Sequence, residues 1–408
     1  MSGEESHGES SAPTEPPGVG SMLGCQKDGF SLPEGCHYLN CAYMSPLSKR
    51  VEEVGVAGVR RKAVPAEIRP ADFFTGCEEA KRLFGKLVNA PDPNRVALIP
   101  AVSYGLSTVA RNTPAAAGQN VVTARQQFPS NVHPWRRLCA ETGVQLRSVA
   151  PVDEPASSGA WNEAILEAID SQTALVALGP IHWTDGTPFD LLQIGERARE
   201  VGAAFVLDGT QAVGVMPFDV QRIRPDALVC ASYKWLTGPY SIGAAYFGPR
   251  YDDGVPLEET WQGKEGSHDF AGLVDQSDRY RSGAARYDVG EPANFILVPM
   301  FIAALEQLLE WGVARIQSYI ADLTRGLFED GRLQESGLCE GPPETEHLFG
   351  LHVPPDVDVA ELQARLRERD VFVSVRGSVI RVSPHVYNDA GDMDALRSAL
   401  LEAKALSQ

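Results

Sequence analysis

Two apolar segments of this chain each lead to an ionisable side chain. The run 205–207 is followed by Asp208, and the run 227–230 leads to Lys234. In an alternating α/β sheet, functional groups gather at the carboxyl ends of parallel strands. We therefore expect Asp208 and Lys234 to face the same crevice.

This acid–lysine pair has the residue types that pyridoxal phosphate (PLP) requires. The lysine forms a Schiff base with the cofactor, and the acid keeps the pyridine nitrogen protonated so that the ring can accept electrons. Either residue alone is a weak signal, but the pair with its neighbours predicts a PLP site. We assign Lys234 and Asp208 as the catalytic residues.

Two further segments could hold the rest of the cofactor. Ser103 and Tyr104 lie between an expected strand and helix, where backbone N–H groups and a capping serine can bind phosphate. Phe128 follows the next strand and could stack on the cofactor ring. The alternatives are an ordinary capped turn and a core phenylalanine.

Three residues are candidates for the substrate side of the site. His182 and Trp183 end another strand, where Trp183 could border the substrate and His182 could act as an acid or base, or simply as a structural hydrogen bonder. Arg381 stands inside an apolar strand and needs an anionic partner, because burial of an unpaired guanidinium is costly. A substrate carboxylate could be that partner. A structural salt bridge is the alternative.

The elements that must position these residues alternate along the chain. Helical periodicity at 47–63 and 71–89 precedes expected strands at 96–99, 120–123, 145–149, 174–178, 203–207, 227–231 and 242–247. Helices are expected between them at 103–112, 131–142, 160–169 and 191–201. This alternation predicts an α/β fold with a large, mostly parallel sheet.

The pattern changes after the last of these strands. Residues 250–288 are rich in charges and glycine, which indicates a long loop region. Helices are then expected at 292–311 and 313–331, before a smaller α+β domain with strands at 347–352, 371–375 and 379–383 and helices at 359–369 and 392–405. We divide the chain into a disordered tail (1–33), an N-terminal segment packing with the small domain (34–64), a large PLP-binding domain (65–290) and a small C-terminal domain (291–408).

Composition limits the partners of this protein. The 408 residues carry a net charge of −18, which argues against nucleic acid and anionic membranes. This charge fits either an ordinary acidic surface or a high-salt environment. The seven scattered cysteines and eight histidines show no metal-ligand spacing and fit a reducing cytoplasm, so we expect no metal. No apolar run approaches the roughly 18 residues that a membrane span needs.

From 38 to 388 the chain resembles the class V aminotransferases, which are PLP-dependent enzymes of fold type I. The order of the motifs matches that of the family. The phosphate turn at Ser103 and Tyr104 comes first, the ring-stacking Phe128 follows, and Asp208 and Lys234 come last. The resemblance implies a homodimer with shared active sites. It also implies roles for four more residues. Tyr233 contacts the cofactor phosphate and Gln211 bonds the phenolic oxygen of PLP. Arg381 binds the substrate carboxylate, and Asn294 contacts the cofactor of the neighbouring subunit.

One departure from the family bears on the reaction. Cysteine desulfurases carry a catalytic cysteine on a loop just before the carboxylate-binding arginine, whereas the segment 374–379 is short and contains none. We therefore expect a PLP enzyme acting on an amino acid, foremost a C–S or C–Se lyase without a catalytic cysteine. The alternatives are a transaminase, an epimerase or kynureninase-like enzyme, and a non-catalytic PLP-fold binding module.

Overall fold

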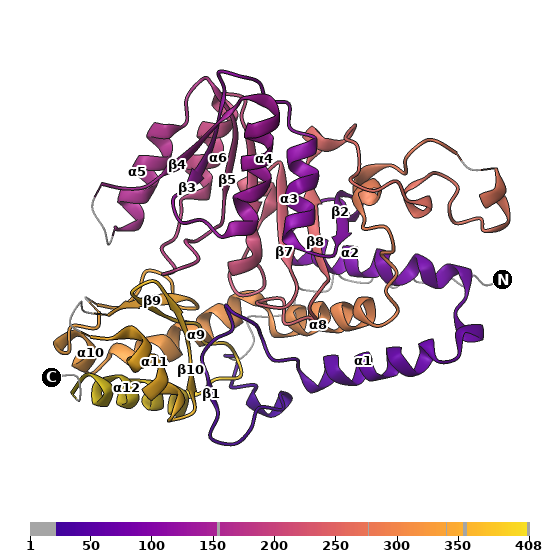
Figure 1. Ribbon diagram of the computed structural model, residues 1–408. Helices are drawn as coiled ribbons and strands as arrows, with labels where there is room; N and C mark the ends of the chain where they lie inside the picture. The colour runs from indigo at the N-terminus through magenta and orange to yellow at the C-terminus, as the bar shows by residue number, and fades with distance from the viewer. Residues whose placement is uncertain (1–21, 153–155, 276, 340, 354–356, 406–408) are drawn as a thin grey trace, which may run out of the picture.

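The computed structural model describes residues 22–152, 156–275, 277–339, 341–353 and 357–405. A large α/β domain carries the C-terminal domain at one end, and α1 (Lys49–Lys62) and α8 (Leu297–Trp311) run along its lower edge (Figure 1). This architecture is the α/β fold with a large, mostly parallel sheet and a smaller α+β domain that the sequence predicts.

The large domain is built on a seven-stranded sheet of order β2-β8-β7-β6-β5-β3-β4. Its neighbours pair in parallel except at β8, which is antiparallel to β7 and β2. The strands are β2 (Val96–Ile99), β3 (Asn120–Ala124), β4 (Gln145–Val149), β5 (Thr173–Leu178), β6 (Ala204–Asp208), β7 (Ala227–Ala231) and β8 (Gly243–Phe247). All seven lie within a residue of their predicted positions.

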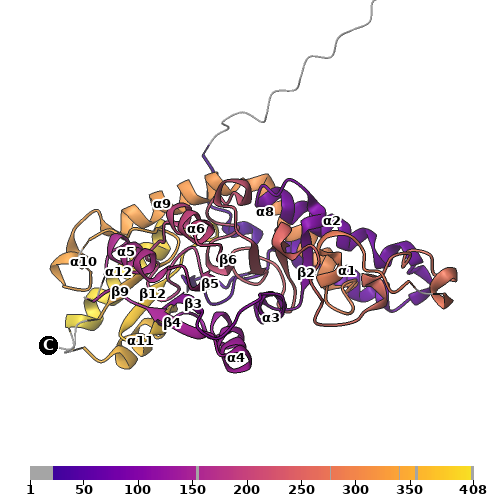
Figure 2. The ribbon, with the colours of Figure 1, turned by 90° about the horizontal axis from the view of Figure 1, so that it is seen from above.

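Helices cover both faces of this sheet, as seen from above in Figure 2. On one face lie α3 (Val102–Arg111) and α4 (His133–Thr142), and the other carries α2 (Thr75–Leu87), α5 (Ser158–Ala168), α6 (Leu191–Glu200) and α8. The strands feed both cores alternately, because successive side chains point to opposite faces. In β7, for example, Leu228 and Cys230 join the α2 side while Val229 joins the α3 side.

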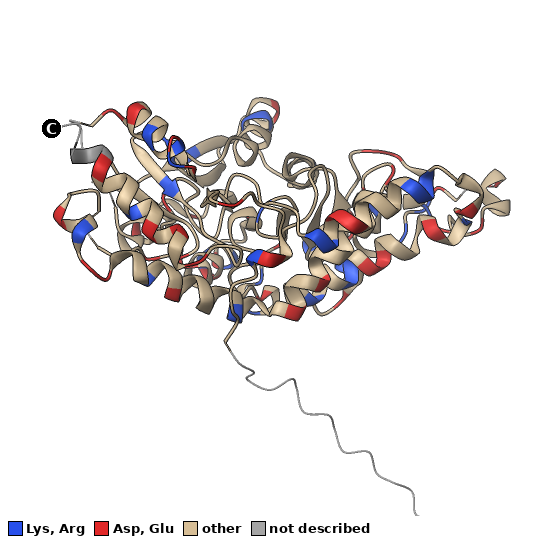
Figure 3. Ribbon diagram, turned by 90° about the horizontal axis from the view of Figure 1, so that it is seen from below, with Lys and Arg blue, Asp and Glu red and all other residues tan. Residues whose placement is uncertain are grey.

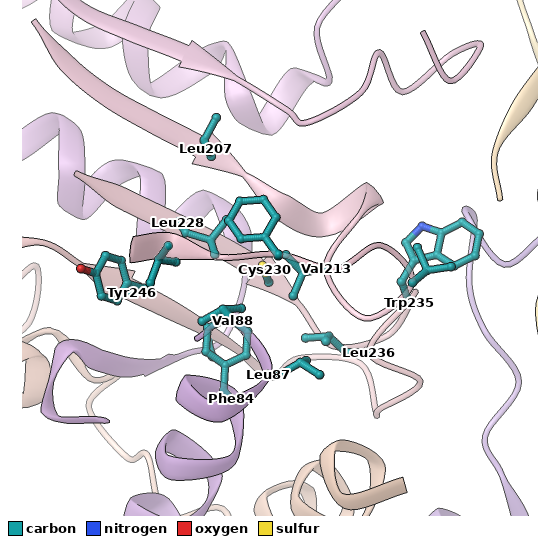
Figure 4. Packing of buried hydrophobic residues seen from close by; sticks show 14 of the residues in the cluster. Phe84, Leu87, Val88, Leu207, Val213, Leu228, Cys230, Trp235, Leu236 and Tyr246 are labelled. Carbon is teal, nitrogen blue, oxygen red and sulfur yellow. The ribbon is translucent and has the colours of Figure 1, made fainter. Parts of the chain in front are cut away.

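The core beneath β7 illustrates this packing. Figure 4 shows Phe84 and Leu87 of α2 pointing toward Leu228 and Cys230 of β7. The residue that follows strand β6 packs tightly against β7, since a Cβ on Gly209 would lie 2.7 Å from Leu228 and 2.8 Å from Cys230. The residue after Asp208 must therefore be small, which fixes the turn that presents the carboxylate.

The C-terminal domain has a three-stranded antiparallel sheet of order β11-β12-β9. The strands are β9 (Phe349–His352), β11 (Ser374–Arg376) and β12 (Val379–Val382), and the helices are α9 (Val313–Phe328), α10 (Arg332–Glu335), α11 (Val359–Arg367) and α12 (Ala390–Ala405). A short strand, β1 (His37–Tyr38), pairs in parallel with β10 (Val371–Phe372) of the small domain.

Two predicted boundaries differ in the structure. Helix α8 begins after residue 291, yet Phe301, Leu305 and Leu308 are buried in the core of the large domain. The boundary at 290/291 is therefore wrong, because an amphipathic helix does not reveal in its own sequence which core it covers.

The other boundary concerns the predicted disordered tail. Its residues 1–21 lie outside the described residues, but 22–33 pack on the C-terminal domain. The N–H of Gln26 donates to the carbonyl of Val386 at 2.7 Å, Lys27 pairs with Asp389 at 2.9 Å, and Phe30 is buried. The prediction for 22–33 is wrong because these partners lie some 360 positions away in the sequence.

The segment 250–288 projects from the body at the upper right of Figure 1. Its described residues form four short 3-10 turns, η7 (Pro249–Tyr251), η8 (Trp261–Gly263), η9 (Ala271–Val274) and η10 (Gly283–Tyr287), and one β-bridge between Lys264 and Tyr280. Aromatic contacts connect it to the start of α2, with Trp261 and Phe270 against Phe73 and Phe74. It is therefore an irregular but packed extension of the large domain.

Acidic and basic residues are interspersed along the lower face, which Figure 3 shows. Arg50 of α1, for example, pairs with Glu306 at 2.6 Å and Glu310 at 2.8 Å on α8. No single described helix is both long and apolar enough to cross a membrane. Helices α8 and α9 meet the length and composition criteria only as a pair, with a 71° bend between them.

Candidate active site

A cavity of about 260 Å³ lies at the carboxyl ends of the central strands. Seven of the ten predicted site residues line it: Ser103, Phe128, Trp183, Asp208, Gln211, Tyr233 and Lys234. They come from five different strand-end loops, which meet at this edge of the sheet.

Lys234 is buried in this cavity, and no acid among the described residues forms an ion pair with it. Its Nζ makes no hydrogen bond or ion pair with any described residue, and it lies 5.3 Å from the ring centroid of Phe128. Burial and the positive charge of Arg381 lower the pKa of Lys234 to about 7. A large fraction of the amine is therefore unprotonated near neutral pH, and an unprotonated amine is nucleophilic and basic.

Asp208 ends β6 and is also unpaired. Its Oδ1 accepts a hydrogen bond from the N–H of Thr210 at 3.1 Å, but no cation among the described residues forms an ion pair with it. Burial raises the pKa of Asp208. A buried carboxylate without a counter-charge is costly, so this position favours a cationic ligand group.

A phosphate-sized anion has a suitable place at the start of α3. Ala101, Val102 and Ser103 line the cavity, and no side chain caps this helix N-terminus. The first N–H groups of a helix have no intrahelical acceptors and carry the positive end of its dipole. The predicted serine cap is therefore absent, and these N–H groups remain free for a ligand.

Two aromatic rings form one wall of the cavity. Phe128 and Trp183 meet edge to face, with ring centroids 5.3 Å apart. The indole N–H of Trp183 donates to the carbonyl of Gln126 at 2.6 Å, and Gln126 has a φ of 56°. A non-glycine residue in this region is strained, and such strain persists where the surroundings hold it in place. The orientation of the Trp183 ring is thus fixed by its backbone partner.

Arg381 lies behind this wall and is only 1% exposed. One guanidinium nitrogen donates to the carbonyl of Trp183 at 2.9 Å, while Nε has no partner. Burial, aided by the charge of Arg376, lowers the pKa of Arg381 to about 9. Since no described carboxylate pairs with Arg381, the structural salt bridge that was the alternative is absent and the guanidinium can still receive an anion.

The family model described as aminotransferase class-V matches residues 66–396, which is most of the chain. The chain belongs to the class V aminotransferase family.

Curated relatives of this family carry several activities in their names. The chain is 28% identical over 320 residues to the uncharacterized aminotransferase YcbU of Bacillus subtilis, covering 78% of this chain and 80% of that one. It is 25% identical to isopenicillin N epimerase of Streptomyces clavuligerus (81% and 84% covered), and 29% identical to a cysteine desulfurase of Enterobacter sp. (61% and 60% covered).

Among solved structures, the chain resembles C-DES with glycine covalently linked to its PLP cofactor. The TM-score is 0.80 at 17% identity, with 90% of this chain and 97% of that one covered. The cofactor of this class V enzyme is pyridoxal phosphate. The cavity fits it, because the unpaired Lys234 amine, the buried Asp208 and the free N–H groups of α3 offer the three kinds of contact that PLP needs.

Three of the predicted site residues of this class V enzyme do not line the cavity. Arg381 lies behind Trp183, as described above. The hydroxyl of Tyr104 contacts Glu258 at 3.2 Å, and Oδ1 of Asn294 accepts hydrogen bonds from the first N–H groups of α8 at 2.9 and 3.1 Å. Within one chain, the side chains of Tyr104 and Asn294 therefore hydrogen-bond to other parts of the protein and do not line the cavity.

Two candidate residues, Gln211 in the cavity lining and His182 beside it, already make hydrogen bonds within the protein. The side-chain amide of Gln211 donates to the carbonyl of Ala42 at 3.2 Å and accepts from Trp235 at 2.9 Å, so one amide hydrogen remains for a ligand. His182 contacts Thr184 at 2.6 Å and the Arg125 carbonyl at 3.0 Å through its two ring nitrogens. His182 is thus a structural hydrogen bonder in this fold.

Sequence reasoning missed other residues of the site. Those that line the cavity without having been predicted include Gln127, Ser130, Gly179, Thr210, Tyr240 and Ser241. Ser241 and Thr237 have φ values of 66° and 50°, so the loop after Lys234 folds back sharply onto the site. Neither is a glycine or asparagine, and the signal for this turn in the sequence is the pair Gly238-Pro239 between them.

Proposed function

We propose that this PLP enzyme takes an amino acid, removes its Cα proton with Lys234, and cleaves a carbon–sulfur or carbon–selenium bond of the side chain. The observation that carries the proposal is the Lys234 amine, which is buried, unpaired among the described residues and shifted to a pKa of about 7. A base works best when its pKa is close to the working pH.

The other site residues take supporting roles in this proposal. When bound, PLP supplies the electron sink that makes the Cα proton acidic. Asp208 holds the proton on the ring nitrogen, Phe128 packs on the ring, and the N–H groups of Val102 and Ser103 bind the phosphate with help from Tyr233. Gln211 contributes its remaining amide hydrogen.

Arg381 binds the substrate's α-carboxylate, and Trp183 shapes the pocket above it. A guanidinium matches a carboxylate with two parallel hydrogen bonds. We expect Arg381→Ala to raise the KM for amino acids well over tenfold, in line with the roughly 2–5 kcal/mol of a desolvated charge pair. Amines without a carboxylate serve as the control and are hardly affected.

Cleavage in this proposal proceeds by direct elimination, without a persulfide on the protein. The hairpin between β11 and β12 has no cysteine, and Cys339 lies outside the cavity in a groove beside β9. The balance for cysteine is cysteine plus water to pyruvate, ammonia and hydrogen sulfide. We expect Cys339→Ser to retain most of the turnover, and loss of activity in this variant restores the desulfurase mechanism.

Transamination is the second candidate, favoured by the 28% identity to an uncharacterized aminotransferase over most of both chains. An epimerase has similar support from the 25% relative, whereas a kynureninase-like reaction rests on the Ser232-Tyr233-Lys234 motif alone. A non-catalytic PLP-binding module is the alternative from another class. The unpaired Lys234 and Asp208 argue against it.

One set of assays separates these reactions. The holoenzyme is incubated with single amino acids in D₂O, and 2-oxo acid, ammonia, sulfide or selenide, and deuterium at Cα are measured with and without an added 2-oxo acid. Elimination releases ammonia with sulfide or selenide. Transamination requires the added 2-oxo acid, and epimerisation gives only deuterated, inverted amino acid. No reaction and no change of the cofactor spectrum with any amino acid contradicts an enzymatic role.

A further inference from the structure

We infer that Arg376 forms a second anion-binding position at this site, so that the substrate is an amino acid with a second carboxylate in its side chain. The inference rests on the proposed function, because it takes the cavity to bind an amino acid through Arg381. Arg376 is then a residue that determines specificity and not a catalytic residue.

The β11–β12 hairpin places the two arginines side by side. Ser374 pairs with Arg381 and Arg376 pairs with Val379 in this antiparallel ladder. Residues two apart on a strand share a face, so Arg376 and Arg381 are diagonal neighbours on one face of the sheet. Gly377, with a φ of 60°, makes the tight turn that brings Arg376 back toward β12.

Both guanidinium groups also face the same side chain of the cavity wall. Their central carbons lie 5.4 Å (Arg376) and 5.7 Å (Arg381) from the ring centroid of Trp183. Trp183 lines the cavity and its indole N–H is held by Gln126, so its ring is a fixed contact that both arginines share at the cavity wall. Positive charge near an indole face is favourable, which helps to hold Arg376 at this position.

Neither arginine has an acidic partner among the described residues. Nε is buried and without a hydrogen bond in both, and among the described residues the guanidinium of Arg376 donates to the carbonyl of its neighbour Val375, at 2.7 Å. The positive charge of Arg376 lowers the pKa of Arg381 and the pKa of Lys234. Asp208 offsets part of this repulsion at Lys234, but no described acid pairs with either arginine, and anionic ligand groups would stabilise the two guanidinium groups.

The two arginines lie at different depths, so each can hold its own anionic group. Arg381 is 1% exposed and lies in the interior. Arg376 is partly exposed at the hairpin turn, where the exposed Tyr43 acts to raise its pKa. Two anionic groups separated along one substrate match these two depths. Together with the proposed cleavage, this points to a cysteine thioether that carries a carboxylate on its sulfur substituent.

Two probes that differ only in the second charge test the inference. S-carboxymethylcysteine and S-carbamoylmethylcysteine are nearly the same size, but only the first has a side-chain carboxylate. Their dissociation constants for the holoenzyme are measured from the change in cofactor absorbance, for the wild type, Arg376→Gln, Arg376→Lys and the control Arg137→Gln. Arg137 is 82% exposed on α4 and its loss changes the net charge equally.

The wild type and Arg137→Gln are expected to bind the acid about tenfold or more tightly than the amide. Arg376→Gln brings the ratio close to one, with the amide bound as before, and Arg376→Lys recovers part of the preference. A purely structural role for Arg376 weakens both probes equally and contradicts the inference. Equal binding of the two probes by the wild type also overturns it, yet leaves the proposed function intact as long as both change the spectrum. If no amino acid changes the spectrum, the proposed function fails as well.

Discussion

Asp208 and Lys234 are both buried in one cavity, yet no ion pair joins them. Such groups are costly to bury unless a ligand completes them. The raised pKa of Asp208 and the lowered pKa of Lys234 both express this cost, since burial is the largest cause of each. At the scale of single residues, the cavity therefore has its ionisable groups arranged for a charged ligand.

The first prediction concerns Asp208. Asp208→Asn removes the charge that keeps the ring nitrogen protonated, and an opposite charge at close range shifts a pKa by roughly 1–3 units. We expect the catalytic rate to fall by about 100-fold or more, with the fold intact and the cofactor still bound. Single-turnover kinetics measure the rate, and Asp253→Asn, at an exposed position of the same charge, serves as the control. A near-normal rate removes Asp208 from the catalytic group.

The second prediction concerns the pH dependence of the cofactor-free protein. The pKa of Lys234 is about 7 when folded and 10.5 in the unfolded chain, so the unfolded state holds more protons between these values. Stability from this residue therefore rises with pH across that window, and the full cost of burying the cation applies below pH 7. We expect Lys234→Met to unfold at a higher temperature than the wild type at pH 7, and the difference to shrink toward pH 10. A pH-independent difference in thermal scans contradicts the lowered pKa.

At the scale of elements, regular strands and helices were predictable because their patterns are local. Strand β6 reads directly as an apolar run that ends in Asp208, and the α/β alternation then determines which strand ends meet. Partners distant in the sequence were not predictable. The contact of Phe30 with Tyr387 has no local pattern, and the role proposed for Arg376 depends on the register of a hairpin.

The third prediction concerns how the segment after η10 is attached. Lys81 of α2 and Asp288 form a buried ion pair at 2.5 Å, and Asp288 also accepts from the N–H of Leu98 in β2 at 2.7 Å. Asp288→Asn leaves the lysine charge buried without a partner, which typically costs about 3–5 kcal/mol. Denaturant unfolding measures the loss.

Two variants check this explanation. Glu79→Gln breaks the exposed pair with Arg82 and is expected to cost less than about 1 kcal/mol. Lys81→Met combined with Asp288→Asn removes the unpaired charge and is expected to recover part of the stability. No recovery in the double variant contradicts the account of a stranded charge.

At the scale of the whole molecule, the fourth prediction is a homodimer. The family resemblance implies active sites at a subunit boundary, and the segment 250–288 projects from the body with Val274 87% exposed. Asn294 lies just before α8 and does not line the cavity of its own chain. We expect sedimentation of the holoenzyme at assay concentration to give a dimer in which Asn294 or a neighbour contacts the partner's cofactor. A fully active monomer contradicts this arrangement.

The central claim is that the amine of Lys234 holds the cofactor in this cavity. Reduction of the holoenzyme with borohydride tests it most directly, because it fixes PLP to the lysine that carries it. Peptide mass mapping is expected to find the label on Lys234 alone, with loss of the visible absorbance, and Lys234→Ala is expected to take up no label while losing turnover. A label on any other lysine, or a labelled Lys234→Ala variant, contradicts the claim.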